Sequence, residues 1–134
     1  MTKLIEIEGI GEVYAQKLQA IGIATLEALL EQGATPKGRE EIAAQTGLSS
    51  KLILRWVNHA DLFRINGIAS QYAELLEAAG VDTVPELAQR NPENLHQKLL
   101  EINEEKKLVR QVAGLNQVSN WIEQAKNLPR LIFY

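Results

Sequence analysis

An internal repeat constrains the fold of this chain more than any other feature of its sequence. Residues 7–26 recur 58 positions later as residues 65–84, within a chain of 134 residues. Nine residues are identical in the two copies, in first-copy numbering Ile7, Gly9, Ile10, Tyr14, Ala15, Leu18, Ala20, Gly22 and Thr25. A repeat at a fixed period indicates that one structural unit occurs twice. We therefore predict two units with the same fold.

The second half of each copy matches more loosely. A Gly-Leu pair precedes Trp56 and another precedes Trp121, but the two tryptophans are 65 positions apart. The second copy therefore holds about seven additional residues, which we place at 101–107. These matches predict two units and a tail: residues 1–62, 63–128 and 129–134. Units of about sixty residues are near the lower size limit for independent folding, so we expect them to pack into one compact domain.

Both copies carry the sequence signals of helices, and neither has the alternating apolar pattern of a β-strand. Apolar residues recur at helical spacing before Gly22, a glycine that is typical of a helix end. Thr25, Thr35-Pro36 and Asn91-Pro92 are typical of helix starts, and residues 83–86 are typical of a capping box. The predicted fold class is all-α, with about four to five helices in each unit.

The composition argues against catalysis and against a bound cofactor or metal. The chain has no cysteine and only two histidines, His59 and His96. His59 lies near Asp61, but one histidine and one carboxylate are too few to hold a metal ion. No serine has a histidine or lysine at a spacing that suggests a nucleophile, and no small-molecule substrate is evident. We therefore expect a binding protein rather than an enzyme.

Charge and hydropathy place further limits on location and partners. The formal net charge is −3, which disfavours a polybasic nucleic-acid protein while leaving a local basic face open. No apolar run approaches the roughly eighteen residues of a membrane helix, and Glu6 and Glu8 come too early for a signal peptide. We expect a cytoplasmic protein that does not contact membranes.

The tripeptide Gly9-Ile10-Gly11 has the strongest chemical content in the sequence. Two glycines around one aliphatic residue permit a tight turn, and the helix that follows begins with free backbone N–H groups. Such a helix start suits an anion such as a phosphate. The second copy reads Gly67-Ile68-Ala69. The candidate backbone sites are Gly9, Ile10, Gly11, Gly67, Ile68 and Ala69; the alternative is that both turns serve packing alone.

The pattern from Ile7 to Thr25 resembles the helix-hairpin-helix motif, and the copy at 65–83 resembles it with Ala69 in place of the second glycine. The tandem arrangement is similar to a bacterial domain family of unknown function built from two such units. The motif implies contact with the sugar-phosphate backbone of DNA through hairpin amides, without reading of the base sequence and sometimes with a bound monovalent cation.

The acidic residues around the first turn depart from such binding. Glu6, Glu8 and Glu12 surround it, and like charges repel a phosphate at contact distance. The second turn is neutral, with Arg64 as the nearest cation. A dinucleotide-binding loop is excluded, because Tyr14 occupies the position of its third glycine and no alternation of strands and helices follows.

Residues 41–56 are similar to a helix-turn-helix, with Gly47 at the turn and Ser49, Ser50, Lys51, Arg55, Asn58 and His59 on the helix that would face nucleic acid. The alternative is an ordinary pair of helix caps. The most basic surface predicted on the chain consists of Lys37, Arg39, Lys51 and Arg55.

The tail carries four consecutive apolar residues, Leu131, Ile132, Phe133 and Tyr134. Left in water they would form an exposed patch, so we expect the tail to be ordered and buried, either on its own chain or on a partner. The resulting prediction is an adaptor that contacts a protein partner or a second copy. The alternative is sequence-independent binding of DNA or RNA through the two turns and the basic surface.

Overall fold

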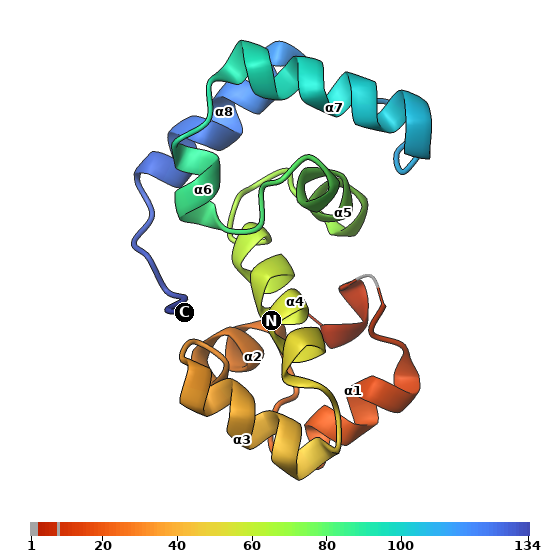
Figure 1. Ribbon diagram of the computed structural model, residues 1–134, viewed down its shortest axis with the longest axis vertical. Coiled ribbons are helices and arrows are strands. Elements are labelled where there is room, and N and C mark those ends of the chain that lie inside the picture. Colours follow the sequence, from red (N-terminus) through yellow and green to blue (C-terminus); the bar gives the residue numbers. More distant parts are fainter. Residues whose placement is uncertain (1–2, 8) are drawn as a thin grey trace. The chain divides into compact units, whose positions relative to one another are not determined.

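A computed structural model describes residues 3–7 and 9–134 of the chain. These residues form one short 3-10 helix and eight α-helices, and no β-strand is found among them (Figure 1). The predicted all-α class is therefore confirmed for the described residues. Glu8, one of the three carboxylates predicted around the first turn, lies outside them.

The chain divides into two compact units. Unit 1 comprises Met1–Asp61 together with Leu131–Tyr134, and unit 2 comprises Leu62–Arg130. The helices up to the border are η1 (Leu4–Glu6), α1 (Glu12–Gln19), α2 (Leu26–Gln32), α3 (Pro36–Thr46) and α4 (Ser50–Leu62). Those of unit 2 are α5 (Ser70–Ala78), α6 (Val84–Ala88), α7 (Pro92–Lys106) and α8 (Leu115–Lys126).

Side-chain caps start three of these helices where the sequence predicts them, and Ser49 caps α4 in the same way by accepting from the Leu52 N–H at 3.1 Å. The Thr25 hydroxyl accepts a hydrogen bond from the Ala28 N–H at 3.1 Å, and Thr35 caps α3 in the same way. Asn91 caps α7 through its side-chain oxygen. The capping box predicted at Thr83 is wrong: its hydroxyl makes no cap bond to the backbone and donates instead to the Glu86 carboxylate at 3.0 Å.

Two glycines end α1 and α5 in the left-handed conformation. Gly22 has φ +88° and Gly80 has φ +91°. Each reversal lets the following N–H reach back to a carbonyl near the end of the helix, from Ile23 to Leu18 at 2.9 Å and from Val81 to Leu76 at 2.8 Å. Residues 58 positions apart in the sequence thus have the same local geometry at the end of both helices.

Each unit is built around one buried tryptophan. In unit 1, Trp56 is fully buried and its ring centroid lies 5.3 Å from that of Tyr14. In unit 2, α8 packs on α6 and α7 and carries Trp121, whose ring centroid lies 5.3 Å from that of Tyr72. Each aromatic pair therefore joins helices of its own unit.

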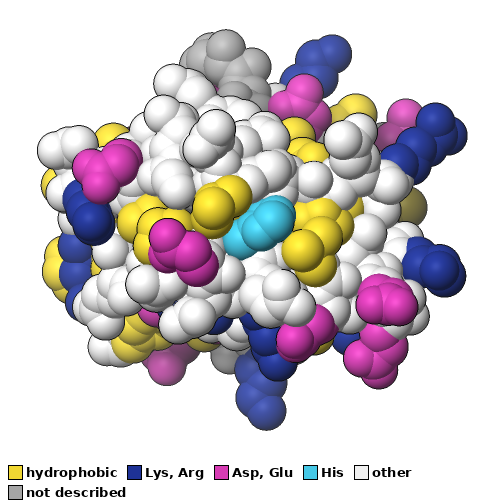
Figure 2. Space-filling view, turned by 90° about the horizontal axis from the view of Figure 1, so that it is seen from above, with side chains coloured by type: hydrophobic (Ala, Val, Ile, Leu, Met, Phe, Trp, Pro, Cys, Tyr) yellow, Lys and Arg dark blue, Asp and Glu magenta, His cyan; other side chains and the backbone are white. Residues whose placement is uncertain are grey.

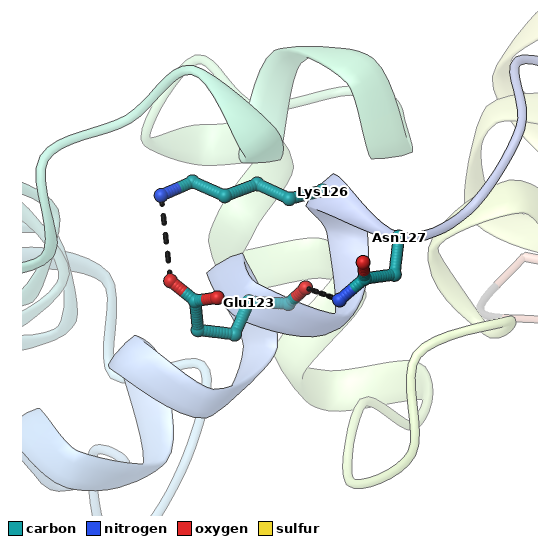
Figure 3. Close-up of polar contacts among 3 residues, drawn as sticks. All are labelled: Glu123, Lys126 and Asn127. Carbon is teal, nitrogen blue, oxygen red and sulfur yellow. Dashed lines mark hydrogen bonds and ion pairs between the residues drawn. The ribbon is translucent and has the colours of Figure 1, made fainter.

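The last turn of α8 fixes where the helix ends. The Asn127 side chain donates to the Glu123 carbonyl at 3.0 Å, and Lys126 lies 3.4 Å from the Glu123 carboxylate (Figure 3). Both charged side chains are more than half exposed, so the ion pair adds little stability. The capped carbonyl and Pro129, two residues beyond Asn127, end the helix before the tail.

Asp82 provides a pH-dependent element of unit 2. Burial raises the pKa of its carboxyl above the ordinary 3.8, and the neighbouring carboxylates of Glu86 and Glu77 raise it further. Ionised Asp82 therefore destabilises the fold at neutral pH, and this penalty disappears as the pH falls through the raised pKa towards 3.8.

Asp82→Asn is therefore expected to raise the melting temperature at pH 7, because it removes a carboxylate that the fold disfavours. The difference from the unaltered protein should vanish near pH 3, where the carboxyl is protonated in both the folded and unfolded states. Thermal denaturation at both pH values measures the effect. Glu105→Gln, on an exposed face of α7, is the control for net charge; an equal gain in that variant would contradict the assignment.

Candidate functional site

The two predicted turns have the same backbone geometry. We call residues 9–11 the first turn and residues 67–69 the second turn. Gly9 has φ +95° and Gly67 has φ +101°. The next residue, Ile10 or Ile68, is buried and donates its N–H to the carbonyl three residues earlier, at 3.1 and 3.2 Å. Neither α1 nor α5 has a side-chain cap, since Gly11 and Ala69 offer no side-chain acceptor.

The first turn lies beside a basic residue that is distant in sequence. Arg55 on α4 places Nη1 about 4.0 Å from the position that a Cβ atom on Gly9 would occupy, and the Trp56 indole nitrogen lies 3.9 Å from the same position. Glu12, the first residue of α1, is exposed. The first turn therefore combines one guanidinium with at least one carboxylate.

The second turn is held by its own unit. The Gln124 side chain accepts from the Asn66 N–H at 2.9 Å and donates to the Asn66 carbonyl at 3.1 Å. Arg64, predicted as the nearest cation, donates two hydrogen bonds to the Pro129 carbonyl, at 2.9 and 2.6 Å. The Trp121 indole nitrogen would lie only 2.9 Å from a Cβ atom on Gly67. Close packing alone therefore requires glycine here.

The predicted basic surface loses one of its four members. Arg39 is 5% exposed and donates from Nη1 to the Gly33 carbonyl and from Nη2 to the Phe133 carbonyl, both at 2.8 Å. Burial lowers its pKa, and Tyr134 opposes that shift. The prediction of Arg39 as a surface cation is wrong because its guanidinium binds carbonyl groups inside unit 1. Lys37 and Lys51 are exposed, and Arg55 is half-buried.

The predicted helix-turn-helix has the expected connection but not the expected surface. Gly47 adopts φ +76° between α3 and α4. Asn58 and His59, which would have faced nucleic acid, are 9% and 1% exposed, so they cannot reach base edges in this conformation. Figure 2 views the molecule from the side of α7 and α8, and on that face Lys and Arg side chains are interspersed with Asp and Glu side chains.

The tail is ordered on unit 1. Phe133 donates its N–H to the Ala34 carbonyl at 2.7 Å and accepts from Arg39, so both of its main-chain polar groups are engaged. The Tyr134 hydroxyl lies 3.2 Å from the Asn58 side-chain oxygen, and the Arg39 guanidinium lies 5.9 Å from the Tyr134 ring centroid. Arg39 therefore connects α3 to the tail by two kinds of contact.

Burial of the tail is confirmed for one side chain only. Ile132 is 2% exposed, whereas Leu131, Phe133 and Tyr134 are 38%, 51% and 59% exposed. The prediction that all four would be buried is wrong. Ile132 alone of the four is buried, between two exposed neighbours, Leu131 and Phe133.

The described residues considered for metal binding do not form a cluster of potential metal ligands. Among residues 3–7 and 9–134, no group of three or more histidine, aspartate or glutamate side chains could hold a metal ion. His59 and Asp61 are both buried on α4. No helix in the described part of the chain is both long and apolar enough to cross a bilayer.

Sequence reasoning missed the residues that fix the tail and the second turn. Arg39 and Asn58 contact the tail across 94 and 76 sequence positions, a distance over which local patterns carry no information. Gln124 contacts Asn66 across 58 positions. The only available signal for Gln124 was its place three residues after Trp121, one helical turn along the same face.

Two glycine turns, two tyrosine–tryptophan pairs and an ordered tail define a small all-α protein with a repeated local geometry. The chain belongs to the family described as "Domain of unknown function (DUF4332)", whose sequence profile matches residues 8–128. This match confirms the predicted resemblance to a domain family of unknown function. No solved structure matches the chain.

Proposed function

We propose that the chain consists of two helix-hairpin-helix units in tandem, the first turn and the second turn being their hairpins. The support is local: the glycine φ angles, the isoleucine hydrogen bonds and the ring separations agree at corresponding positions of the sequence repeat. The proposal assigns Gly9-Ile10-Gly11 and Gly67-Ile68-Ala69 equivalent roles at the start of α1 and α5.

We further propose that the protein is a non-enzymatic adaptor that binds another protein through its tail. The observation that carries this proposal is the state of Phe133. Its main chain is hydrogen-bonded on both sides, while its side chain is 51% exposed. An aromatic side chain held in place before binding loses little conformational entropy on binding, and aromatic anchors dominate the energies of protein interfaces.

The chemistry of the tail indicates the kind of partner. Leu131, Phe133 and Tyr134 are each exposed, and the Tyr134 hydroxyl lies 3.2 Å from the Asn58 side-chain oxygen. The complementary surface is an apolar groove with a pocket of aromatic-ring size. A second copy of the chain is one form of such a partner.

A photo-crosslinking amino acid placed at position 133 tests the adaptor proposal in cells that contain the protein. We expect a discrete covalent adduct with one partner, or with a second copy. The matched control places the same group at Val13, which is 67% exposed on α1. Equal adducts from both positions, or none from position 133, would contradict the proposal. Leu131→Ala should weaken the adduct without lowering the melting temperature.

Binding to nucleic acid remains a second candidate because Arg55 lies beside the first turn. Neither α1 nor α5 has a side-chain cap, so the backbone N–H groups at the start of each helix are available to a phosphate. Lys37 and Lys51 are exposed cations of the same unit. The function proposed is sequence-independent contact with the DNA or RNA backbone.

A salt titration with duplex and single-stranded nucleic acid tests this candidate, since backbone binding weakens steeply with salt. Lys51→Glu combined with Arg55→Glu should reduce affinity for all base sequences alike. Lys51→Glu alone guards against a folding defect from altering Arg55. Lys98→Glu with Lys106→Glu, on exposed positions of unit 2, makes the same change in net charge. An equal loss in that control would remove the basic surface from the argument.

A further inference from the structure

Unit 2 contains a cavity that neither proposed function uses. Its volume is about 540 Å3, within the range of small-molecule sites. It is lined by Gln71 from the N-terminal end of α5, by Asn103 and Glu104 from α7, and by residues 107–110 after α7. Three of the lining residues, Asn103, Glu104 and Lys107, fall within residues 101–107, where we place the additional residues of the second copy.

The loop that lines the cavity is fixed rather than loosely attached. The Asn103 side chain donates to the Val109 carbonyl at 3.0 Å and accepts from the Val109 N–H at 2.9 Å. The Tyr72 hydroxyl donates to the Gln111 carbonyl at 2.7 Å and so ties the next part of the loop to α5. A wall held at both ends presents its side chains in a defined arrangement.

The charged residues that line the cavity carry a net positive charge. Lys107 and Arg110 supply two positive charges and Glu104 supplies one negative charge, in a chain whose net charge is −3. Among the described residues, the structure gives neither the Lys107 ammonium nor the Arg110 guanidinium an ion-pair or hydrogen-bond partner. Both groups are therefore available to an anion.

Lys107 adopts a backbone conformation that glycine adopts more easily. It caps α7 with φ +52° and ψ +47°, and it is the only residue other than glycine with a positive φ in the described chain. Glycine is the usual residue at this kind of helix end because a side chain strains the left-handed conformation. Lys107 holds this strained conformation while its residue lines the cavity.

We propose that this cavity binds a small organic phosphate that also carries hydroxyl groups. Lys107 and Arg110 bind the phosphate, Arg110 through the fork of N–H donors that matches phosphate oxygens. Glu104 accepts a hydrogen bond from a hydroxyl group, and Leu108 and Val109 contact the carbon skeleton. The carboxylate of Glu104 disfavours a continuous polyanion such as DNA, which would bring further phosphates against it.

Isothermal titration calorimetry with ribose 5-phosphate in low salt tests the proposal. We expect ribose 5-phosphate to bind, inorganic phosphate to bind more weakly, and ribose not to bind. Lys107→Gly with Arg110→Gln should lower the affinity at least tenfold, and glycine at position 107 is compatible with the left-handed backbone. Lys3→Gln with Lys17→Gln removes the same charge from exposed positions of unit 1 that belong to neither proposed site, and it should leave the affinity unchanged.

Glu104→Gln separates the two parts of the ligand. It should narrow the difference in affinity between ribose 5-phosphate and inorganic phosphate, because the hydroxyl group loses its charged acceptor. The proposal is overturned if ribose 5-phosphate does not bind at millimolar concentration, or if the unit 1 control lowers affinity equally. It is also overturned if duplex DNA binds, and Lys107→Gly with Arg110→Gln abolishes that binding, while ribose 5-phosphate does not bind.

Discussion

Trp121→Ala is expected to lower the free energy of unfolding by about 3–5 kcal/mol, as large-to-small changes of buried aromatic residues do. Trp121 is 1% exposed, and α8 carries it into the core of unit 2 against Tyr72. A loss of this size is a large part of the stability of a small domain. Urea denaturation followed by circular dichroism measures it.

The chain supplies its own reporter for this experiment. It has two tryptophans, so the fluorescence of the Trp121→Ala variant comes from Trp56 alone and reports on unit 1. Trp121→Phe is the matched control: the indole N–H has no hydrogen-bond partner, so phenylalanine forfeits volume but no hydrogen bond. A loss below about 1 kcal/mol in the alanine variant would contradict the assignment of Trp121 as a core anchor.

Gly67→Ala is expected to lower the free energy of unfolding by about 2–4 kcal/mol, because backbone strain and a steric clash act at the same position. The φ of +101° is unfavourable for any residue with a Cβ atom. The added carbon would also lie 2.9 Å from the Trp121 indole nitrogen, a core side chain that cannot move away freely. Chemical denaturation of the variant gives the loss directly.

Gly80→Ala separates these two effects. Gly80 has a similar φ of +91°, but a Cβ atom there would meet nothing within 4 Å. Backbone strain alone should cost about 1–2 kcal/mol at this position. Equal losses at positions 67 and 80 would show that the contact with Trp121 adds nothing, contrary to the packing described for the second turn.

The parts of the fold that local chemistry determines could be predicted from the sequence. Thr25 and Thr35 have side-chain acceptors immediately before helical segments, and both cap their helices. Gly22 stands where a helix must reverse, and it adopts the left-handed conformation. In each case the cause and the effect lie within a few residues, where sequence patterns are informative.

Contacts between distant residues could not be predicted. Arg39 lies in a polar helix and precedes two glutamates, a pattern typical of a solvated face, yet its guanidinium is buried by contacts with Gly33 and Phe133. Lys107 and Arg110 lie in a loop with no periodic pattern, and the cavity between them and Gln71 depends on how α5 and α7 pack. Such sites are defined by tertiary structure alone.

The contact between Arg39 and Phe133 also sets an order of events during synthesis. The ribosome makes residues 62–130, all of unit 2, before it reaches the segment that binds α3. One of the two carbonyl partners of Arg39 is therefore made 94 residues after Arg39 itself. During this interval only the Gly33 carbonyl, of these two acceptors, is present, and the surface that Ile132 later covers is open to solvent. Domains usually fold in the order in which they are synthesised. Here the N-terminal unit 1 can complete its fold only after all of unit 2 has been made.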